Sequence, residues 1–141
     1  MKKVHTVIAG SLMLAVIVQF YLAAAGAFDR SPTEEAFAGH RGLGYVILLL
    51  AVVVTAVGAI ARMPGRLIGL SGAVAALVVL QILIKEVATA IGDGTGAGVY
   101  VFGLHALNGM LIVGLSGTTL RTSRRLSTPA ATERAAERSA P

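Results

Sequence analysis

Long apolar stretches separated by short polar segments dominate the chain. Four of these stretches are long enough to cross a lipid bilayer, at residues 4–27, 43–61, 67–91 and 99–120. A helix needs about 20 apolar residues to span the hydrocarbon core. The third stretch carries Lys85 and Glu86 near its end, a place where a spanning helix tolerates charge. The pattern therefore predicts four membrane-spanning helices.

The polar segments predict where these helices begin and end. Ser31-Pro32-Thr33-Glu34 has the form of a capping box, so the second helix is expected to start near residue 32. Met63-Pro64-Gly65 predicts a tight turn that makes the second and third helices antiparallel neighbours. The resulting prediction is a transmembrane domain over 1–121, with helices at roughly 4–27, 32–61, 67–91 and 99–120, and a disordered tail over 122–141.

Composition supports the membrane assignment. Hydrophobic residues make up 55% of the 141 residues and charged residues 13%, and the mean hydropathy is +0.79. Soluble domains of this length are far less apolar. The chain contains no Cys, which excludes disulfides, thiolate metal sites and covalent haem attachment.

Charge placement predicts the orientation of the helices in the membrane. The cations gather before the first helix, in the second loop and after the fourth helix: Lys2, Lys3, Arg62, Arg66, Arg121, Arg124, Arg125, Arg134 and Arg138. Because cationic loops stay in the cytoplasm, both termini are expected to be cytoplasmic. The pI near 10.3 is then explained by the orientation in the membrane and by attraction to anionic lipid. No nucleic-acid partner is expected.

A signal peptide is the alternative for the N-terminus. Lys2 and Lys3, an apolar run and Ala25-Gly26-Ala27 resemble such a peptide with its cleavage site. The apolar run exceeds the roughly 7–15 residues of a typical signal-peptide core, and it contains Gln19. A retained first helix is therefore expected.

A polar pattern occurs twice and suggests an internal repeat. His-x-x-x-Gly is found at His40 and Gly44, and again at His105 and Gly109. A Gln precedes each copy within the previous apolar helix, at position 19 and at position 81. Residues 4–62 and 67–121 thus look like two copies of a two-helix unit. The predicted fold is an all-α membrane bundle of four helices, built from two parallel repeats around an axis along the membrane normal.

The repeated polar residues predict one layer in the outer half of the bundle. A rise of 1.5 Å per residue places Gln19, Gln81 and His105 about 10–15 Å from the outer helix ends. The inner half is expected to be almost purely apolar, and His5 is interpreted as an interfacial hydrogen-bonding residue. In the repeat, His40 and His105 face each other across the bundle centre. They could then serve as axial ligands to a haem iron, with space left by the small residues one turn further on.

The chain resembles two kinds of known protein. Two histidines near the outer ends of the second and fourth helices resemble one half of the haem A synthase family. The segments "VQFYLAAAGAF", "GHRGLGY" and "LHALNG" are similar to an uncharacterised family of small four-helix bacterial membrane proteins. Haem A synthases carry a glutamate within one turn before the first ligand, whereas Ala36 and Phe37 stand in that turn here. The resemblance therefore implies a b-type haem site at His40 and His105, without oxidation of the haem.

Other polar residues allow two interpretations each. Gln19, Gln81 and Asn108 either tie helices together by hydrogen bonds or orient the histidines through their second ring nitrogen. Lys85 either extends to the membrane surface or, together with Arg41, neutralises haem propionates.

Three functions follow from these interpretations. The first is a membrane cytochrome in the bacterial cytoplasmic membrane, acting as a redox carrier rather than an enzyme, with quinol or another membrane redox protein as partner. The second is a non-haem structural or assembly subunit of a homo- or hetero-oligomer. The third is a small-molecule carrier, ranked lowest because no polar path is expected in the inner half.

The predicted topology can be tested with reporters. A reporter fused after Pro141 should be active only in the cytoplasm, because the surrounding segment is cationic, and one inserted near Thr95 only outside. Cytoplasmic activity at the Thr95 position would contradict both the four-helix topology and the repeat.

Overall fold

Helices form nearly all of the described part of the protein. The computed structural model describes residues 1–92 and 96–128, and every regular element in these ranges is a helix. The elements are α1 (Lys2–Phe28), α2 (Thr33–Ala36), α3 (Ala38–Ile60), α4 (Gly65–Ile91) and α5 (Gly96–Ser127). Four of them, α1, α3, α4 and α5, are long and apolar enough to cross a membrane. The protein is therefore a multi-pass membrane protein, and the predicted all-α four-helix class is confirmed.

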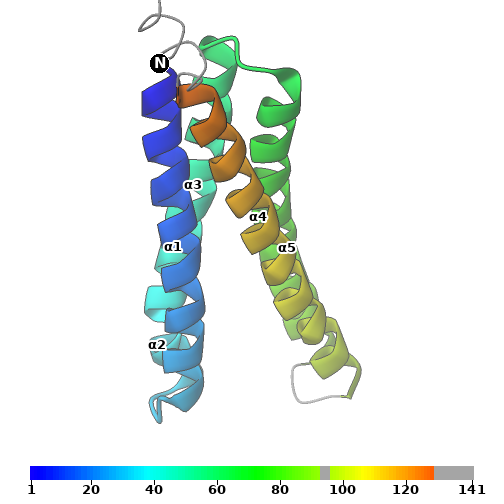
Figure 1. Ribbon diagram of the computed structural model, residues 1–141. Coiled ribbons are helices and arrows are strands. Elements are labelled where there is room, and N and C mark those ends of the chain that lie inside the picture. Colours follow the sequence, from blue (N-terminus) through cyan, green and yellow to red (C-terminus); the bar gives the residue numbers. More distant parts are fainter. Residues whose placement is uncertain (93–95, 129–141) are drawn as a thin grey trace, which may run out of the picture.

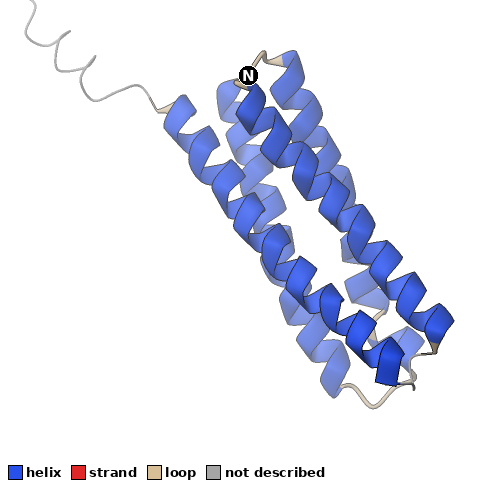
Figure 2. Ribbon diagram, turned by 90° about the vertical axis from the view of Figure 1, so that its right-hand side faces the viewer, coloured by secondary structure: helices blue, strands red, loops and turns tan. Residues whose placement is uncertain are grey.

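The four long helices form an antiparallel bundle. Each packs against two neighbours, in the cyclic order α1, α3, α4, α5, so that α3 lies diagonally opposite α5. The N-terminus and the last turn of α5 lie at the same end of the bundle (Figures 1 and 2). The α3–α4 turn is at this end too. Because it collects the cations that flank the helices, we call it the basic end, and we call the opposite end the distal end.

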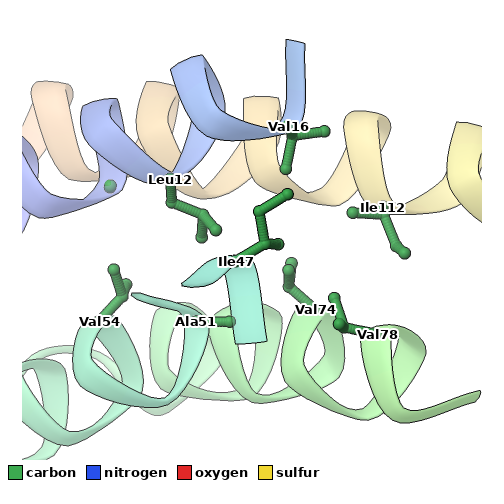
Figure 3. Packing of buried hydrophobic residues seen from close by; sticks show 9 residues of the cluster. Leu12, Val16, Ile47, Ala51, Val54, Val74, Val78 and Ile112 are labelled. Carbon is green, nitrogen blue, oxygen red and sulfur yellow. The ribbon is translucent and has the colours of Figure 1, made fainter. Parts of the chain in front are cut away.

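The bundle core is small and apolar. It consists of buried side chains from all four long helices: Ala9, Leu12, Val16, Ile47, Ala51, Val54, Val74, Val78 and Ile112 (Figure 3). Most other large apolar side chains of the helices face outward, with exposed fractions such as 63% for Leu14 and 62% for Leu49. Such a surface is unfavourable in water and matches the hydrocarbon of a bilayer.

The second predicted helix is interrupted at its start, which corrects the prediction of one helix over 32–61. The chain makes the short helix α2 and then turns at Phe37, whose φ of −101° and ψ of 11° lie outside the helical region. The capping box is also wrong, because no side chain caps α2. Instead, the Ser31 backbone N–H donates to Asp29 Oδ1 at 2.9 Å. This hydrogen bond lowers the pKa of the Asp29 carboxyl below its ordinary value.

Gly26 allows the α2–α3 junction to approach α1 closely. A methyl group at this position would lie 2.8 Å from the Ala36 carbonyl oxygen and 3.0 Å from the Phe37 ring. Carbon atoms do not approach a backbone oxygen this closely without displacement of the chain. The absence of a side chain at Gly26 is therefore a condition for this packing.

The basic end differs from the prediction in one respect. The predicted turn at Met63-Pro64-Gly65 is present, with Arg62 at a φ of 51° and the Met63 N–H donating to the Gly58 carbonyl. However, α5 continues to Ser127, seven residues beyond the predicted end at 120. Residues 122–127 are thus helical and not part of a tail. The rest of the predicted tail, from residue 129, lies outside the described residues, as do residues 93–95 of the predicted outer loop.

Replacement of Gly26 by alanine should destabilise the bundle. The added methyl group must displace the Ala36 carbonyl, which we expect to reduce the free energy of unfolding by about 1–3 kcal/mol. Gly42→Ala is the matched control, since a methyl group there meets nothing within 4 Å. That change should be neutral or stabilising by up to about 1 kcal/mol. Unfolding in detergent measures both variants, and equal stabilities would contradict the close approach at Gly26.

Candidate functional site

Two histidines meet in the distal half of the bundle. His40 is the third residue of α3, and His105 lies in the third turn of α5, on the diagonally opposite helix. Their ring centres are 6.2 Å apart and the ring planes are inclined by 43°. The predicted pairing of these side chains across the bundle is therefore present in the structure.

The backbone of each histidine accepts a hydrogen bond from the glutamine of the same repeat. Gln19 Nε2 donates to the His40 carbonyl oxygen at 2.8 Å, and Gln81 Nε2 donates to the His105 carbonyl oxygen at the same distance. The repeated glycines make room for these amides. A methyl group at Gly44 would lie 3.4 Å from Gln19 Nε2, and one at Gly109 would lie 3.7 Å from Gln81 Nε2. The repeat seen in the sequence thus corresponds to a repeated Gln–His–Gly contact.

The repeat has a further member, which was not among the predicted site residues. Phe37 and Phe102 each lie three residues before a histidine, so the repeated pattern is Phe-x-x-His-x-x-x-Gly. The Phe102 ring stacks on His105, with ring centres 5.2 Å apart and planes inclined by 10°. The Phe37 ring meets His40 edge-on at 6.1 Å. The signal was available, since residues three apart share a helix face.

The His40 ring has a defined tautomer. Its Nδ1 lies 3.2 Å from the backbone carbonyl oxygen of Gln19. A carbonyl oxygen can only accept, so Nδ1 carries the hydrogen, which in the neutral ring leaves the lone pair on Nε2. Donation from one ring nitrogen to a backbone carbonyl is the arrangement that orients a histidine whose other nitrogen binds a metal.

The second repeat distributes its hydrogen bonds differently. Asn108 Nδ2 donates to the Leu77 carbonyl oxygen at 2.8 Å and also to Gln81 Oε1. The corresponding position of the first repeat is Leu43. His105 Nδ1 is buried and has no hydrogen-bond partner among the described residues, and the same holds for Gln19 Oε1 and Asn108 Oδ1. Within the described residues, the polar layer of the distal half therefore contains two buried amide oxygens without a partner, while the His105 ring lies against the Gln81 backbone.

The observed contacts decide between the two roles expected for Gln19 and Gln81. The amide groups do not accept a hydrogen bond from either imidazole, which was one of the two expectations for them. They join helices by donating to the histidine backbone, which is the other expectation. For His40, the orienting acceptor is the backbone of Gln19 rather than its side chain.

Arg41 and Lys85 both have a carboxylate partner. Arg41 pairs with Glu34 at 3.0 Å, and Lys85 pairs with the adjacent Glu86 at 3.1 Å. Both pairs are partly exposed, and exposed ion pairs contribute little stability. Either cation could therefore exchange its partner for another carboxylate at low cost.

A second polar cluster at the basic end was not predicted. His5 is completely buried, and its Nδ1 lies 2.8 Å from Ser123 Oγ. Thr6 Oγ1 lies 2.7 Å from Ser123 Oγ and 2.7 Å from Ser127 Oγ. His5 therefore forms a hydrogen bond, as expected, and its partner Ser123 lies inside the bundle at the basic end.

The two glutamines should differ in their contribution to stability. Gln81→Leu removes one hydrogen bond to His105 and one from Asn108, so we expect a loss of about 1–2 kcal/mol of unfolding free energy. Gln19→Leu removes one hydrogen bond together with an unpartnered buried oxygen, so its effect should stay below about 1 kcal/mol. Unfolding of the matched pair in one detergent provides the comparison. A larger loss for Gln19→Leu would contradict this hydrogen-bond network.

Comparison with known proteins identifies the family of the chain. No curated protein and no solved structure matches the sequence. A family model described as "Family of unknown function (DUF6220)" matches residues 19–90. This segment begins at Gln19, contains His40 and Gly44, and ends after Gln81. Since it covers half of the chain, the protein belongs to the DUF6220 family.

Proposed function

We propose that the protein binds a b-type haem between α3 and α5, with His40 and His105 as the two axial ligands, and that it carries electrons near the outer face of the membrane. The observation that carries this proposal is the separation of the two imidazoles. The ring centres are 6.2 Å apart, a separation at which both imidazoles would reach a metal ion held between them.

The hydrogen bonds of the histidines also fit a ligand role. His40 donates from Nδ1 to a backbone carbonyl and so keeps the lone pair of Nε2 available. The His105 ring lies against the backbone of Gln81, which is the corresponding contact in the second repeat. The donor set is therefore suited to an iron with two neutral imidazoles.

Other residues would position the histidines and the edge of the cofactor. The amides of Gln19 and Gln81 fix the backbone of the two helices at the level of the histidines. Arg41 and Lys85, which have exposed carboxylate partners, could pair with haem propionates instead. A bound haem would supply a one-electron redox couple. The resemblance to one half of the haem A synthases rests on the same two histidines.

The proposed surroundings follow from the same reasoning. With the basic end in the cytoplasm, the histidine pair lies in the outer half of a bacterial cytoplasmic membrane. A quinol within the bilayer, or a second membrane redox protein, could then exchange electrons with the site. The proposed role is that of a redox carrier and not of an enzyme.

Visible spectroscopy tests the ligation. Protein purified from haem-supplied cells should be coloured, with the sharp split bands of low-spin iron when reduced, and should not readily bind carbon monoxide. His40→Ala and His105→Ala should each give high-spin or lost haem, because each change removes one axial ligand. Added imidazole should restore the low-spin spectrum in a variant that retains haem.

His5→Gln is the control for these variants. It changes the third histidine, which lies at the opposite end of the bundle, so the spectrum should remain that of the original protein. A colourless protein from haem-supplied cells would overturn the proposal. Spectra unchanged by both ligand variants would exclude His40 and His105 as the ligands.

A structural or assembly subunit is the second candidate function. It is favoured by the observation that Gln19, Gln81 and Asn108 all donate across helix boundaries to backbone carbonyls. Such bonds stabilise a bundle whether or not a cofactor is present. The colour of the purified protein distinguishes the two candidates.

A further inference from the structure

The side chain of Phe102 lies flat against the imidazole of His105. The ring centres are 5.2 Å apart and the planes are inclined by 10°, which is a parallel stack within the usual range for aromatic pairs. Both residues belong to α5 and are three positions apart, so they share one face of the helix. The stack is therefore formed within a single helix.

Such a stack restricts the imidazole in a way that the helix backbone does not. The second side-chain torsion of histidine is broad, so the helix by itself leaves the plane of the ring undetermined. A flat neighbour stabilises the orientations in which the two rings are parallel. The His105 ring also lies against the backbone of Gln81. Contacts from α5 and from α4 thus act together on this ring.

The first repeat orients its histidine by a different contact. His40 Nδ1 donates to the Gln19 carbonyl oxygen at 3.2 Å, and the Phe37 ring meets the imidazole edge-on, with the planes inclined by 88°. Phe37 also ends α2 and lies close to Gly26. It therefore has a structural role in the α2–α3 junction. The phenylalanines of the two repeats correspond in sequence but differ in what they do.

Phe102 lies outside the bundle core. Its exposed fraction is 51%, and it does not belong to the cluster of buried apolar side chains that joins the four long helices. Its ring contact within the described residues is the stack on His105. Replacement of Phe102 should therefore change the surroundings of this histidine and leave the core intact.

We propose that Phe102 is a positioning residue for His105. Its ring fixes the plane of the imidazole and thereby the angle between the planes of the two histidines, which is 43° in this structure. One part of the proposal rests on the haem function proposed above. When two imidazoles are the axial ligands of an iron, the angle between their planes affects the splitting of the iron d orbitals. Phe102 would then tune the electronic state of the iron through its ligand.

Nuclear magnetic resonance of the haem-free protein tests the effect on the ring. The chain has three histidines, so ring-labelled histidine gives three signals, and replacement of each histidine in turn assigns them. Protons above an aromatic face are shielded, so the His105 signal should move downfield in Phe102→Leu. It should also broaden, because the ring samples a wider range of its torsion. The His5 signal should not change.

Two further variants serve as controls in the same spectra. Phe102→Tyr retains a stacking face and should retain the shift and width of the His105 signal. Phe28→Leu makes the same change as Phe102→Leu at a phenylalanine that is 89% exposed and has no ring contact in the described part of the chain. It should leave all three signals in place. A His105 signal of unchanged shift and width in Phe102→Leu would overturn the proposal.

Electron paramagnetic resonance of the oxidised, haem-loaded protein tests the link to the iron. The largest g value should differ between Phe102→Leu and the original protein, whereas Phe102→Tyr and Phe28→Leu should retain it. The affinity for added haem should fall by about 2- to 10-fold in Phe102→Leu, the factor that corresponds to one aromatic pair.

The two measurements separate this inference from the proposed function. A merely structural role of Phe102 would lower haem retention and leave the g values of the bound fraction unchanged, and this result would overturn the positioning role. If the original protein binds no haem, the proposed function fails. The spectra of the haem-free protein then decide alone whether Phe102 fixes the His105 ring.

Discussion

The fold depends on the need of every buried polar group for a partner in surroundings that contain little water. Between helices in a bilayer, apolar contact alone gives no advantage over contact with lipid. Close packing of small residues and hydrogen bonds between helices must supply the difference. Here the amide of each repeated glutamine donates to the backbone of a neighbouring helix, at the level of a histidine. The glycines Gly44 and Gly109 let these amides approach.

This constraint also explains how the two repeats differ. Leu43 in the first repeat corresponds to Asn108 in the second. The asparagine occupies the oxygen of Gln81, whereas the oxygen of Gln19 has no partner among the described residues. The amide orientations are determined by these contacts, because a carbonyl acceptor requires the nitrogen of each amide to face it. In both repeats the histidine ring lies against the backbone of its glutamine, and in the second repeat the glutamine oxygen is engaged as well.

Much of the architecture could be predicted because it depends on patterns of residues that are close together in the sequence. The four spans follow from apolar length, and the turn after α3 follows from Pro64 and Gly65. The facing histidines follow from the repeat. The break at Phe37 could not be predicted, since it depends on the approach of α1 at Gly26. The burial of His5 also depends on a distant partner, because Ser123 lies 118 residues away in the chain. Single serines and threonines carry too weak a pattern to reveal such a cluster.

The local hydrogen bonds of the helix hydroxyls have a consequence for lateral association. Ser11, Thr55 and Thr118 lie within the long helices and donate to the carbonyl oxygen four residues earlier in the same helix. They therefore offer no free donor to the outside, and a neighbouring protein in the bilayer meets a surface that is chemically close to acyl chains. Recognition by a neighbouring protein at these positions therefore depends on the fit of ridges and small residues more than on donated hydrogen bonds.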